Sequence, residues 1–286
     1  MDPSPDTPRP ADVRRRFDRA AASFDDADFV HRASGDGLLE RLAPVTVEAR
    51  RVLELGSATG TLARQLTKRF RKSRVICLDL SGAMLAECRR RRSRFSRLTE
   101  LQAEAGALPL ADGSIDVVVA NQLLPWVADP PRLFAEVARV LREGGVFAFA
   151  SLGPDSLREL REAFAGDETA HVQAFADMHD VGDALVRAGL RDPVLDVDRL
   201  EVAYADTEAL YRDLSACGAR NTLAGRRRTL TGRQRFARAD AALAAQSRDG
   251  RLRLSLELTY GHAWGSGARP AAGEFRVPVG KLTRRR

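Results

Sequence analysis

Short apolar runs that alternate with helical segments constrain the fold of this chain more than any other feature of its sequence. The clearest run, Ile115–Ala120, is almost continuously apolar. Such runs are typical of parallel strands that are buried on both faces of a sheet. The runs lie at 51–55, 75–79, more weakly around Leu101, at 115–120 and at 146–150. With helical periodicity between them, this order predicts right-handed βαβ crossovers and a doubly wound α/β sheet.

The segment before these repeats is predicted to be helical. Apolar residues recur at helical spacing through residues 12–43, and we expect N-terminal helices with a bend near Gly35 and Gly37. The predicted domain runs from these helices to the last alternating strand, so it covers residues 12–265.

The segment after the repeats has a different order. Strands are predicted over 194–204 and 252–260, with a helical insertion at 205–248 placed as a cap over the site-bearing face. Residues 1–11 contain four prolines and predict a flexible leader, and residues 266–286 are rich in Gly, Pro and Arg and predict a disordered basic tail.

The composition excludes several classes of protein. Hydrophobic residues make up 44% and charged residues 30%, which is ordinary for a globular domain. No stretch approaches the ~20 apolar residues that a membrane span needs, and no secretory signal pattern is visible. The three cysteines lack metal-ligand spacing, which argues against a zinc site or a disulfide framework. We therefore expect a cytoplasmic protein with no metal and no membrane partner.

A glycine-containing turn follows the first predicted strand and indicates nucleotide binding. The turn is Glu54–Gly60, in which Gly56 and Gly60 permit close approach of the backbone to a ligand at a helix N-terminus. Asp79 ends the second predicted strand, where a carboxylate accepts hydrogen bonds from ribose hydroxyls. The pattern lacks the third glycine of a dinucleotide site.

This E-x-G-x-x-x-G pattern resembles motif I of class I methyltransferases, which bind S-adenosylmethionine on a Rossmann-like seven-stranded sheet. The stretch Leu108–Asp116 is similar to another hallmark of that family. The resemblance implies that Glu54 faces the methionine end of the cofactor and that Asn121 lies near the transferable methyl group. The residues expected to bind the cofactor are Glu54, Gly56, Ser57, Gly60, Asp79, Leu80, Glu104, Ala105 and Asn121, with Glu104 and Ala105 at the adenine. Ala58 departs from the family, which usually has glycine there; its methyl is tolerated if its φ stays negative.

A narrower resemblance covers about residues 12 to 265. Segments such as Asn121–Val127, Leu152–Leu160 and Phe175–Asp183 are similar to the malonyl-carrier-protein O-methyltransferase family. That family methylates the free carboxylate of a malonyl thioester, on acyl-carrier protein or coenzyme A, in biotin precursor synthesis. A mitochondrial branch with the same layout acts in assembly of a respiratory complex, so a non-methylating assembly factor is the alternative hypothesis.

The implied reaction explains which side chains the site needs. A malonyl carboxylate is already ionised near neutral pH, so we expect a positioning mechanism without a catalytic acid or base. A cation, preferably arginine, is needed to hold the carboxylate. The candidates are Arg220, Arg228 and Arg233, and the sequence does not choose among them. Phe24, where many members of the family have tyrosine, and Trp126 are expected to line the substrate pocket.

Two remaining features have competing interpretations. The formal net charge of +7 favours an acidic partner, and Arg14–Arg16 and Arg226–Arg228 are candidate docking clusters for a carrier protein, or else solvated faces. An RNA methyltransferase is a third hypothesis, but no RNA-binding module or aromatic-interleaved basic surface supports it, so no nucleic-acid partner is expected. His179, between Asp177 and Asp180, is predicted to belong to a capped helix end and not to a metal site.

Overall fold

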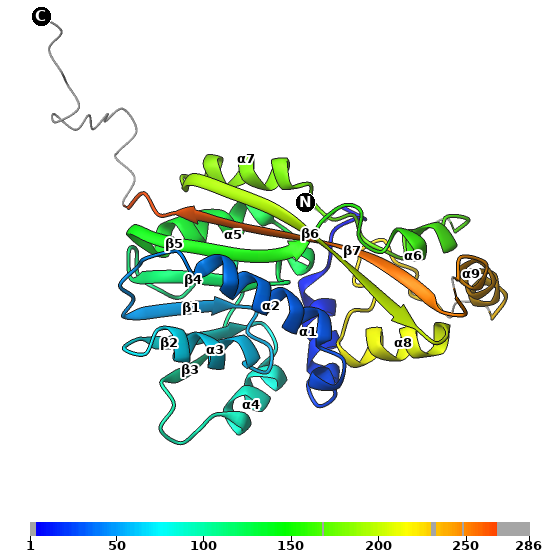
Figure 1. Cartoon of the computed structure of the whole chain (residues 1–286), viewed down its shortest axis with the longest axis horizontal. Helices are drawn as coiled ribbons and strands as arrows, with labels where there is room; N and C mark the ends of the chain where they lie inside the picture. Colours follow the sequence, from blue (N-terminus) through cyan, green and yellow to red (C-terminus); the bar gives the residue numbers. More distant parts are fainter. Residues whose placement is uncertain (1–3, 168, 230–232, 248, 268–286) are drawn as a thin grey trace, which may run out of the picture.

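Seven strands form one twisted sheet in the order β3-β2-β1-β4-β5-β7-β6 (Figure 1). The computed structural model describes residues 4–167, 169–229, 233–247 and 249–267. All neighbouring strands are parallel except β7, which runs antiparallel to both β5 and β6. The strands are β1 (Arg51–Leu55), β2 (Arg74–Asp79), β3 (Leu98–Gln102), β4 (Ile115–Asn121), β5 (Leu141–Leu152), β6 (Arg191–Tyr204) and β7 (Leu252–Trp264). The doubly wound α/β prediction is confirmed.

Helices cover both faces of this sheet, which explains why its central strands are apolar. The helices are α1 (Pro10–Ala20), α2 (Phe29–Leu42), α3 (Thr61–Arg69), α4 (Gly82–Arg91), α5 (Pro130–Val140), α6 (Arg158–Ala163), α7 (Met178–Ala188), α8 (Thr207–Ala216) and α9 (Arg233–Ala245), with short 3₁₀ turns at Phe24–Asp26 and Leu124–Trp126. On one face, α2, α3 and α4 pack on the strands, and on the other face α5 and α7 do so. None of the described helices combines the length and the apolar character that crossing a bilayer requires.

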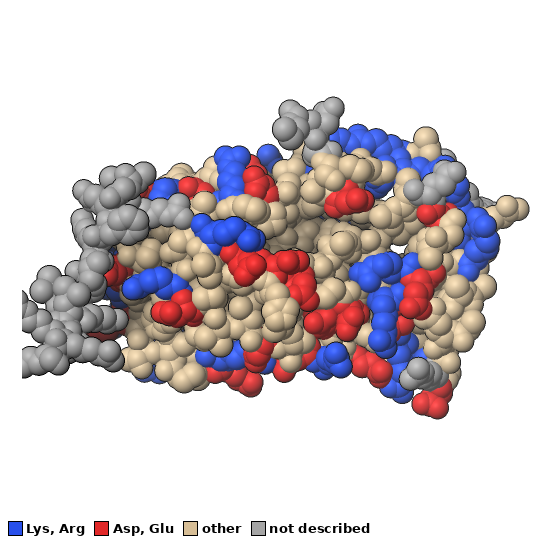
Figure 2. Space-filling model, turned by 90° about the horizontal axis from the view of Figure 1, so that it is seen from above, with Lys and Arg blue, Asp and Glu red and all other residues tan. Residues whose placement is uncertain are grey.

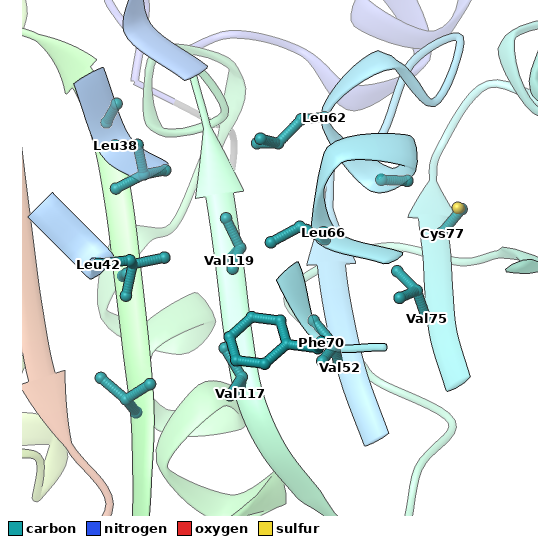
Figure 3. Packing of buried hydrophobic residues seen from close by; sticks show 14 of the residues in the cluster. Leu38, Leu42, Val52, Leu62, Leu66, Phe70, Val75, Cys77, Val117 and Val119 are labelled. Atoms are coloured by element: carbon teal, nitrogen blue, oxygen red, sulfur yellow. The ribbon is translucent and has the colours of Figure 1, made fainter. Parts of the chain in front are cut away.

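The core under α2 and α3 fixes the edge of the sheet where the strands end. Leu62 and Leu66 of α3 pack against Val119 of β4, and Leu38 of α2 lies beside them (Figure 3). These side chains are at most 5% exposed, and burying each fully contributes about 1.5–3 kcal/mol. The helix N-termini that face the carboxyl ends of the strands are thereby held in place.

The cap lies beyond the sheet, at the end to which β6 and β7 extend (Figure 1). Helices α8 and α9 are inserted between these two strands, as the sequence predicted, and α6 packs beside them. Their shared core consists of Leu160, Leu210, Leu243, Leu252 and Leu254. The cap is therefore a second hydrophobic unit built on the same two long strands.

The predicted flexible leader is hydrogen-bonded to the cap over its described part. Pro8 forms an isolated antiparallel bridge with Leu223, and the Arg9 amide donates to the Thr222 carbonyl at 3.0 Å. Helix α1 then begins at Pro10, so it includes the last two residues of the expected leader. Of the expected basic tail only residues 266 and 267 are described, so that expectation lies otherwise outside the described residues.

The predicted bend near Gly35 and Gly37 is wrong. Both glycines lie inside the continuous helix α2, and the chain instead breaks between α1 and α2, at residues 21–28. Gly37 is required by packing, because a Cβ there would lie 2.5 Å from the Tyr260 hydroxyl and 2.9 Å from the Cζ atom of that ring. Tyr260 is only 2% exposed and has no room to move away.

Replacement of Gly37 by alanine is expected to lower the free energy of unfolding by about 1–3 kcal/mol, because the added methyl overpacks a buried aromatic contact. Urea denaturation followed by circular dichroism measures this change. Gly166→Ala is the matched control, because no atom lies within 4 Å of a Cβ built at that position. Equal stabilities of the two variants would contradict the packing argument.

Candidate cofactor and substrate site

The glycine turn after β1 is held against the end of β2. The Gly56 and Ser57 amides donate to the Leu78 carbonyl at 2.8 and 3.0 Å. Gly56 and Gly60 have φ values of +69° and +77°, which only glycine adopts without strain. A Cβ at Gly60 would also overlap the sulfur of Cys88, so the turn lies directly on α4. The turn therefore leads into the N-terminus of α3, and its residues line a small hollow beside it.

Asp79 ties this turn to the next one. Its Oδ2 accepts from the Ala58 amide at 2.9 Å and its Oδ1 accepts from the Ser81 amide at 2.8 Å. Burial raises the pKa of its carboxyl to about 6, and the nearby Asp18 carboxylate adds to this rise, although the amide hydrogen bonds oppose it. Asp79 also lines a cleft that lies between the glycine turn, α1 and the segment after β3, called the cleft below.

Two unpartnered polar atoms lie where the resemblance predicts the methionine end of the cofactor. Among the described side chains, Glu54 Oε2 and Ser57 Oγ are buried without a hydrogen-bond partner. Burial raises the pKa of Glu54 well above its usual range, and the neighbouring Cys88 and Asp79 add to the rise. Both residues line a small hollow beside the turn, called the methionine hollow below. A cationic group there would satisfy both atoms and keep the carboxylate ionised.

The methyl group of Ala58 was expected to be tolerated if the φ of this residue is negative, and its φ is not negative. Its φ is +45°, in the left-handed region, so the methyl is accommodated with backbone strain. The residue is nevertheless held there, because its amide donates to Asp79. Its side chain packs against the cluster that contains Phe24 and Met84.

Ala58→Gly is expected to raise the free energy of unfolding by about 0.5–1 kcal/mol, because glycine adopts this φ without strain. Chemical denaturation of the two proteins measures the difference. A loss of stability instead would mean that the packing of the methyl group outweighs the strain of its backbone.

Helix α1 covers the part of the cleft where the resemblance predicts the adenine. Glu104 and Ala105 follow β3 and line the cleft together with Leu80, and Val13 and Phe17 of α1 close it from above. Helix α1 is fixed there because the Ser81 hydroxyl donates to Asp18 at 2.6 Å. The sequence of α1 does not indicate that this helix belongs to the site, because its apolar face is indistinguishable from a helix face that packs on the core.

Asn121 lines the cleft, but its side chain is committed to α2. Its Nδ2 donates to the His31 carbonyl and its Oδ1 accepts from the Ser34 hydroxyl, both at 2.8 Å. Its amide thus joins the end of β4 to α2 and holds His31 at the cleft. Asn121 lines both the cleft and the small hollow beside the glycine turn, and its expected contact with a cofactor stays a prediction.

A second, mostly apolar hollow lies between the sheet and the cap. Its walls come from α2, β7, α8 and the loop after α6. It shares the lining residues His31, Gln122 and Trp126 with the cleft. Trp126 packs edge-on against Phe17 with ring centroids 5.1 Å apart. Phe24, which was expected in the substrate pocket, is buried and lines both the cleft and the methionine hollow.

The three candidate arginines occupy different places. Arg220 lines the apolar hollow, is exposed, and donates to the Ser215 hydroxyl at 2.8 and 2.6 Å. Arg228 lies 3.9 Å from Asp12 and lines none of these hollows. Arg233 begins α9, but its side chain lies outside the described residues.

The two predicted docking clusters converge on one buried carboxylate. Asp12 is 5% exposed and pairs with Arg226 at 2.6 Å and with Arg15 at 3.3 Å. Nearby, burial lowers the pKa of Arg16, as do the positive charges of Arg220, Arg226 and Arg19. We call Arg16, Arg19, Arg220 and Arg226 the arginine cluster. Figure 2 shows Lys and Arg side chains gathered at the end of the molecule that carries the cap.

The helix around His179 is capped as predicted. Asp177 precedes α7 and its Oδ1 accepts from the His179 amide at 2.7 Å. Among the described residues, no group of three or more His, Cys, Asp or Glu side chains is arranged to hold a metal ion.

Comparison with known proteins gives consistent matches. A family model described as a methyltransferase domain matches residues 53–149. A malonyl-[acyl-carrier protein] O-methyltransferase of Halorhodospira halophila is 44% identical over 96% of this chain and 95% of its own length. One of the same name from Laribacter hongkongensis is 46% identical over 90% of each chain. The crystal structure of the YcgJ protein of Bacillus subtilis superposes with a TM-score of 0.58 at 15% identity, over 83% of this chain and 100% of that one.

Proposed function

Because the chain belongs to the malonyl-[acyl-carrier protein] O-methyltransferase family, we propose that it transfers a methyl group from S-adenosylmethionine to the free carboxylate of a malonyl thioester on acyl-carrier protein. The observation that carries this proposal is that the cleft over the glycine turn and the apolar hollow under the cap share three lining residues. Donor and acceptor would meet there. Family membership favours this reaction over the assembly-factor hypothesis.

The side chains around the cleft fit S-adenosylmethionine. Glu54 and Ser57 have unpartnered oxygens for the methionine ammonium group, and Asp79 presents a carboxylate to the ribose. Glu104 and Ala105 are placed for the adenine. When bound, the cofactor supplies a methyl group made electrophilic by its sulfonium charge.

The residues of the chain then need only position the acceptor and exclude water. A malonyl carboxylate is ionised near neutral pH, so no proton has to be removed before it attacks. Val13 and Phe17 of α1 cover the cleft, and the leucines of the cap cover the hollow. A positioned, dry site of this kind lowers the barrier through proximity and through weaker screening of charge. We therefore propose no catalytic acid or base.

The substrate arm and its protein carrier are assigned to the hollow and its rim. An acyl arm with few charges suits the apolar walls, which include Leu210, Leu214 and Leu254. Arg220 stands at the rim within the arginine cluster, where it suits an acidic carrier. We place the reaction in biotin precursor synthesis and the protein in the cytoplasm, where its three free cysteines remain reduced.

Mass spectrometry of malonyl-carrier protein after incubation with enzyme and S-adenosylmethionine tests the reaction. We expect a gain of one methyl group on the malonyl moiety and no gain on acetyl-carrier protein, which lacks the free carboxylate. Malonyl-coenzyme A, tested in parallel, shows whether the carrier is required. Complementation of a biotin-requiring strain that lacks its own methyltransferase tests the pathway. Methyl transfer to neither malonyl thioester would overturn the proposal.

A further inference from the structure

We propose that His31 and Gln122 together bind the malonyl carboxylate, as a pair of neutral hydrogen-bond donors at the point where the methyl group is transferred. This inference rests on the proposed function, because it assigns a place to the acceptor of that reaction. It goes beyond the arginine candidates that the sequence suggested.

The position of the methyl group follows from the hollows that surround it. The sulfonium of S-adenosylmethionine lies between its methionine and adenosine ends. We therefore place it where the methionine hollow meets the cleft, which would hold the adenosine end. The acceptor arrives from the apolar hollow under the cap. Among the described residues, His31 alone lines all three spaces. Gln122 lines the cleft and the apolar hollow.

Both side chains carry a buried nitrogen that nothing in the described protein satisfies. His31 Nδ1 and Gln122 Nε2 have no hydrogen-bond partner. Buried polar atoms are rarely left unpaired, and those that remain at a ligand junction indicate a missing partner. The two nitrogens belong to residues that line the same pair of spaces, so a single anionic group is the simplest partner for both.

The backbone around each residue holds it in place. The His31 carbonyl accepts from Asn121 Nδ2 at 2.8 Å, and the His31 ring packs against Phe24 with centroids 4.9 Å apart. Gln122 has a φ of +55°, a conformation that a non-glycine residue keeps only under constraint. The backbone N–H of Gln122 donates to the Ala150 carbonyl at 2.7 Å, and this bond holds the backbone in that conformation. Such strain is typical of functional sites.

Neutral donors suit this reaction. Burial lowers the pKa of the His31 imidazole to about 4, so it is uncharged at neutral pH, and the Gln122 amide carries no charge. Two neutral N–H groups orient a carboxylate and replace its water, yet leave its negative charge available to attack the sulfonium-bound carbon. A bidentate arginine would instead occupy both oxygens. Arg220, exposed at the rim, is thereby assigned to the carrier side.

Equilibrium binding distinguishes this role from a structural one. Malonyl- and acetyl-carrier protein are titrated calorimetrically into enzyme saturated with S-adenosylhomocysteine, which prevents transfer. We expect His31→Leu and Gln122→Leu each to weaken malonyl-carrier binding about 10-fold, as loss of one hydrogen bond to a charged group does, with less than a 2-fold change for acetyl-carrier protein. His31→Gln, which keeps an N–H donor, should retain most of the affinity.

The controls separate the possible failures. His179→Leu, a matched change on the exposed start of α7, should alter neither affinity. A thermal unfolding transition like that of wild type, followed by circular dichroism, shows that each variant is folded. Equal weakening of malonyl and acetyl binding, or no weakening of either, would overturn the assignment of His31 and Gln122. A wild-type enzyme that fails to prefer malonyl over acetyl would instead overturn the proposed function itself.

Discussion

Asp79→Ala is expected to weaken S-adenosylmethionine binding by about 100-fold or more. The variant loses two charge-assisted hydrogen bonds to the ribose, each contributing about 1.5–3 kcal/mol. It also leaves the amides of Ala58 and Ser81 without the carboxylate that now accepts from both, so the glycine turn loses one of its attachments to β2 and keeps those to the Leu78 carbonyl. Isothermal titration calorimetry measures the affinity. Asp183→Ala, a carboxylate removed from an exposed site on α7, is the control.

The pH dependence of binding provides an independent check on Asp79. Burial raises the pKa of its carboxyl to about 6 in the folded protein, above the value of about 3.9 for an unfolded chain. The ionised form is therefore unfavourable for the ligand-free fold above pH 6, and this penalty disappears as the pH falls toward 4. Cofactor binding needs the ionised form, so affinity should fall below about pH 6. Asp79→Ala should weaken this dependence and leave the part that comes from Glu54, whose pKa burial also raises. A wild-type affinity that is flat from pH 5 to 8 would contradict the assignment.

The fold was predictable because its information is local. Strand β4 is buried on both faces, so its residues had to be apolar almost without interruption, and the same holds for β1 and much of β5. The edge strand β6 begins at Arg191, three residues before the predicted start. The three residues that were missed, 191–193, show no apolar alternation. The pairing of β6 with β7 is also irregular between Arg191 and Val194.

The cofactor side of the site was also visible in the sequence, whereas the acceptor side was not. Gly56, Gly60 and Asp79 are recognisable because the turn and the strand end impose residue types at fixed spacing. His31 reaches the junction only because Asn121, 90 residues further along the chain, holds α2 against β4. A contact of that range leaves no local signal.

The backbone conformation of Ala58 was beyond the sequence for a different reason. Alanine gives no sign of a positive φ, since most alanines avoid it, and here the hydrogen bonds of the turn, including that to Asp79, hold it in this conformation. The predicted bend near Gly35 and Gly37 was wrong for a similar reason. Gly37 suggested a break, but its missing side chain serves the Tyr260 ring inside a continuous helix.

Reversal of two charges in the arginine cluster, Arg16→Glu with Arg220→Glu, is expected to lower kcat/KM for malonyl-carrier protein by about 30- to 100-fold at low ionic strength. The pKa of Arg16 is lowered by burial and by the like charges of Arg220, Arg226 and Arg19, and the Asp12 carboxylate offsets only part of this effect, so an approaching anion relieves the remaining repulsion. Rim charges of this kind mainly steer association, and salt at 0.15 M screens them beyond about 8 Å. The loss should therefore shrink as salt is added.

Malonyl-pantetheine separates docking of the carrier from damage to the pocket, because it keeps the reacting group and the arm but has no acidic protein attached. The double variant should use it within about 3-fold of wild type, since the apolar walls and the junction are unchanged. Arg71→Glu with Arg94→Glu makes the same change in net charge at exposed positions near β2 and β3, remote from the cap, and should leave carrier kinetics unaltered. If that control loses as much activity as the cluster variant, net charge alone attracts the carrier. If kcat/KM of the cluster variant falls as much for malonyl-pantetheine as for malonyl-carrier protein, Arg220 acts inside the pocket. Arg220 would then again be a candidate for binding the malonyl carboxylate, as the sequence suggested.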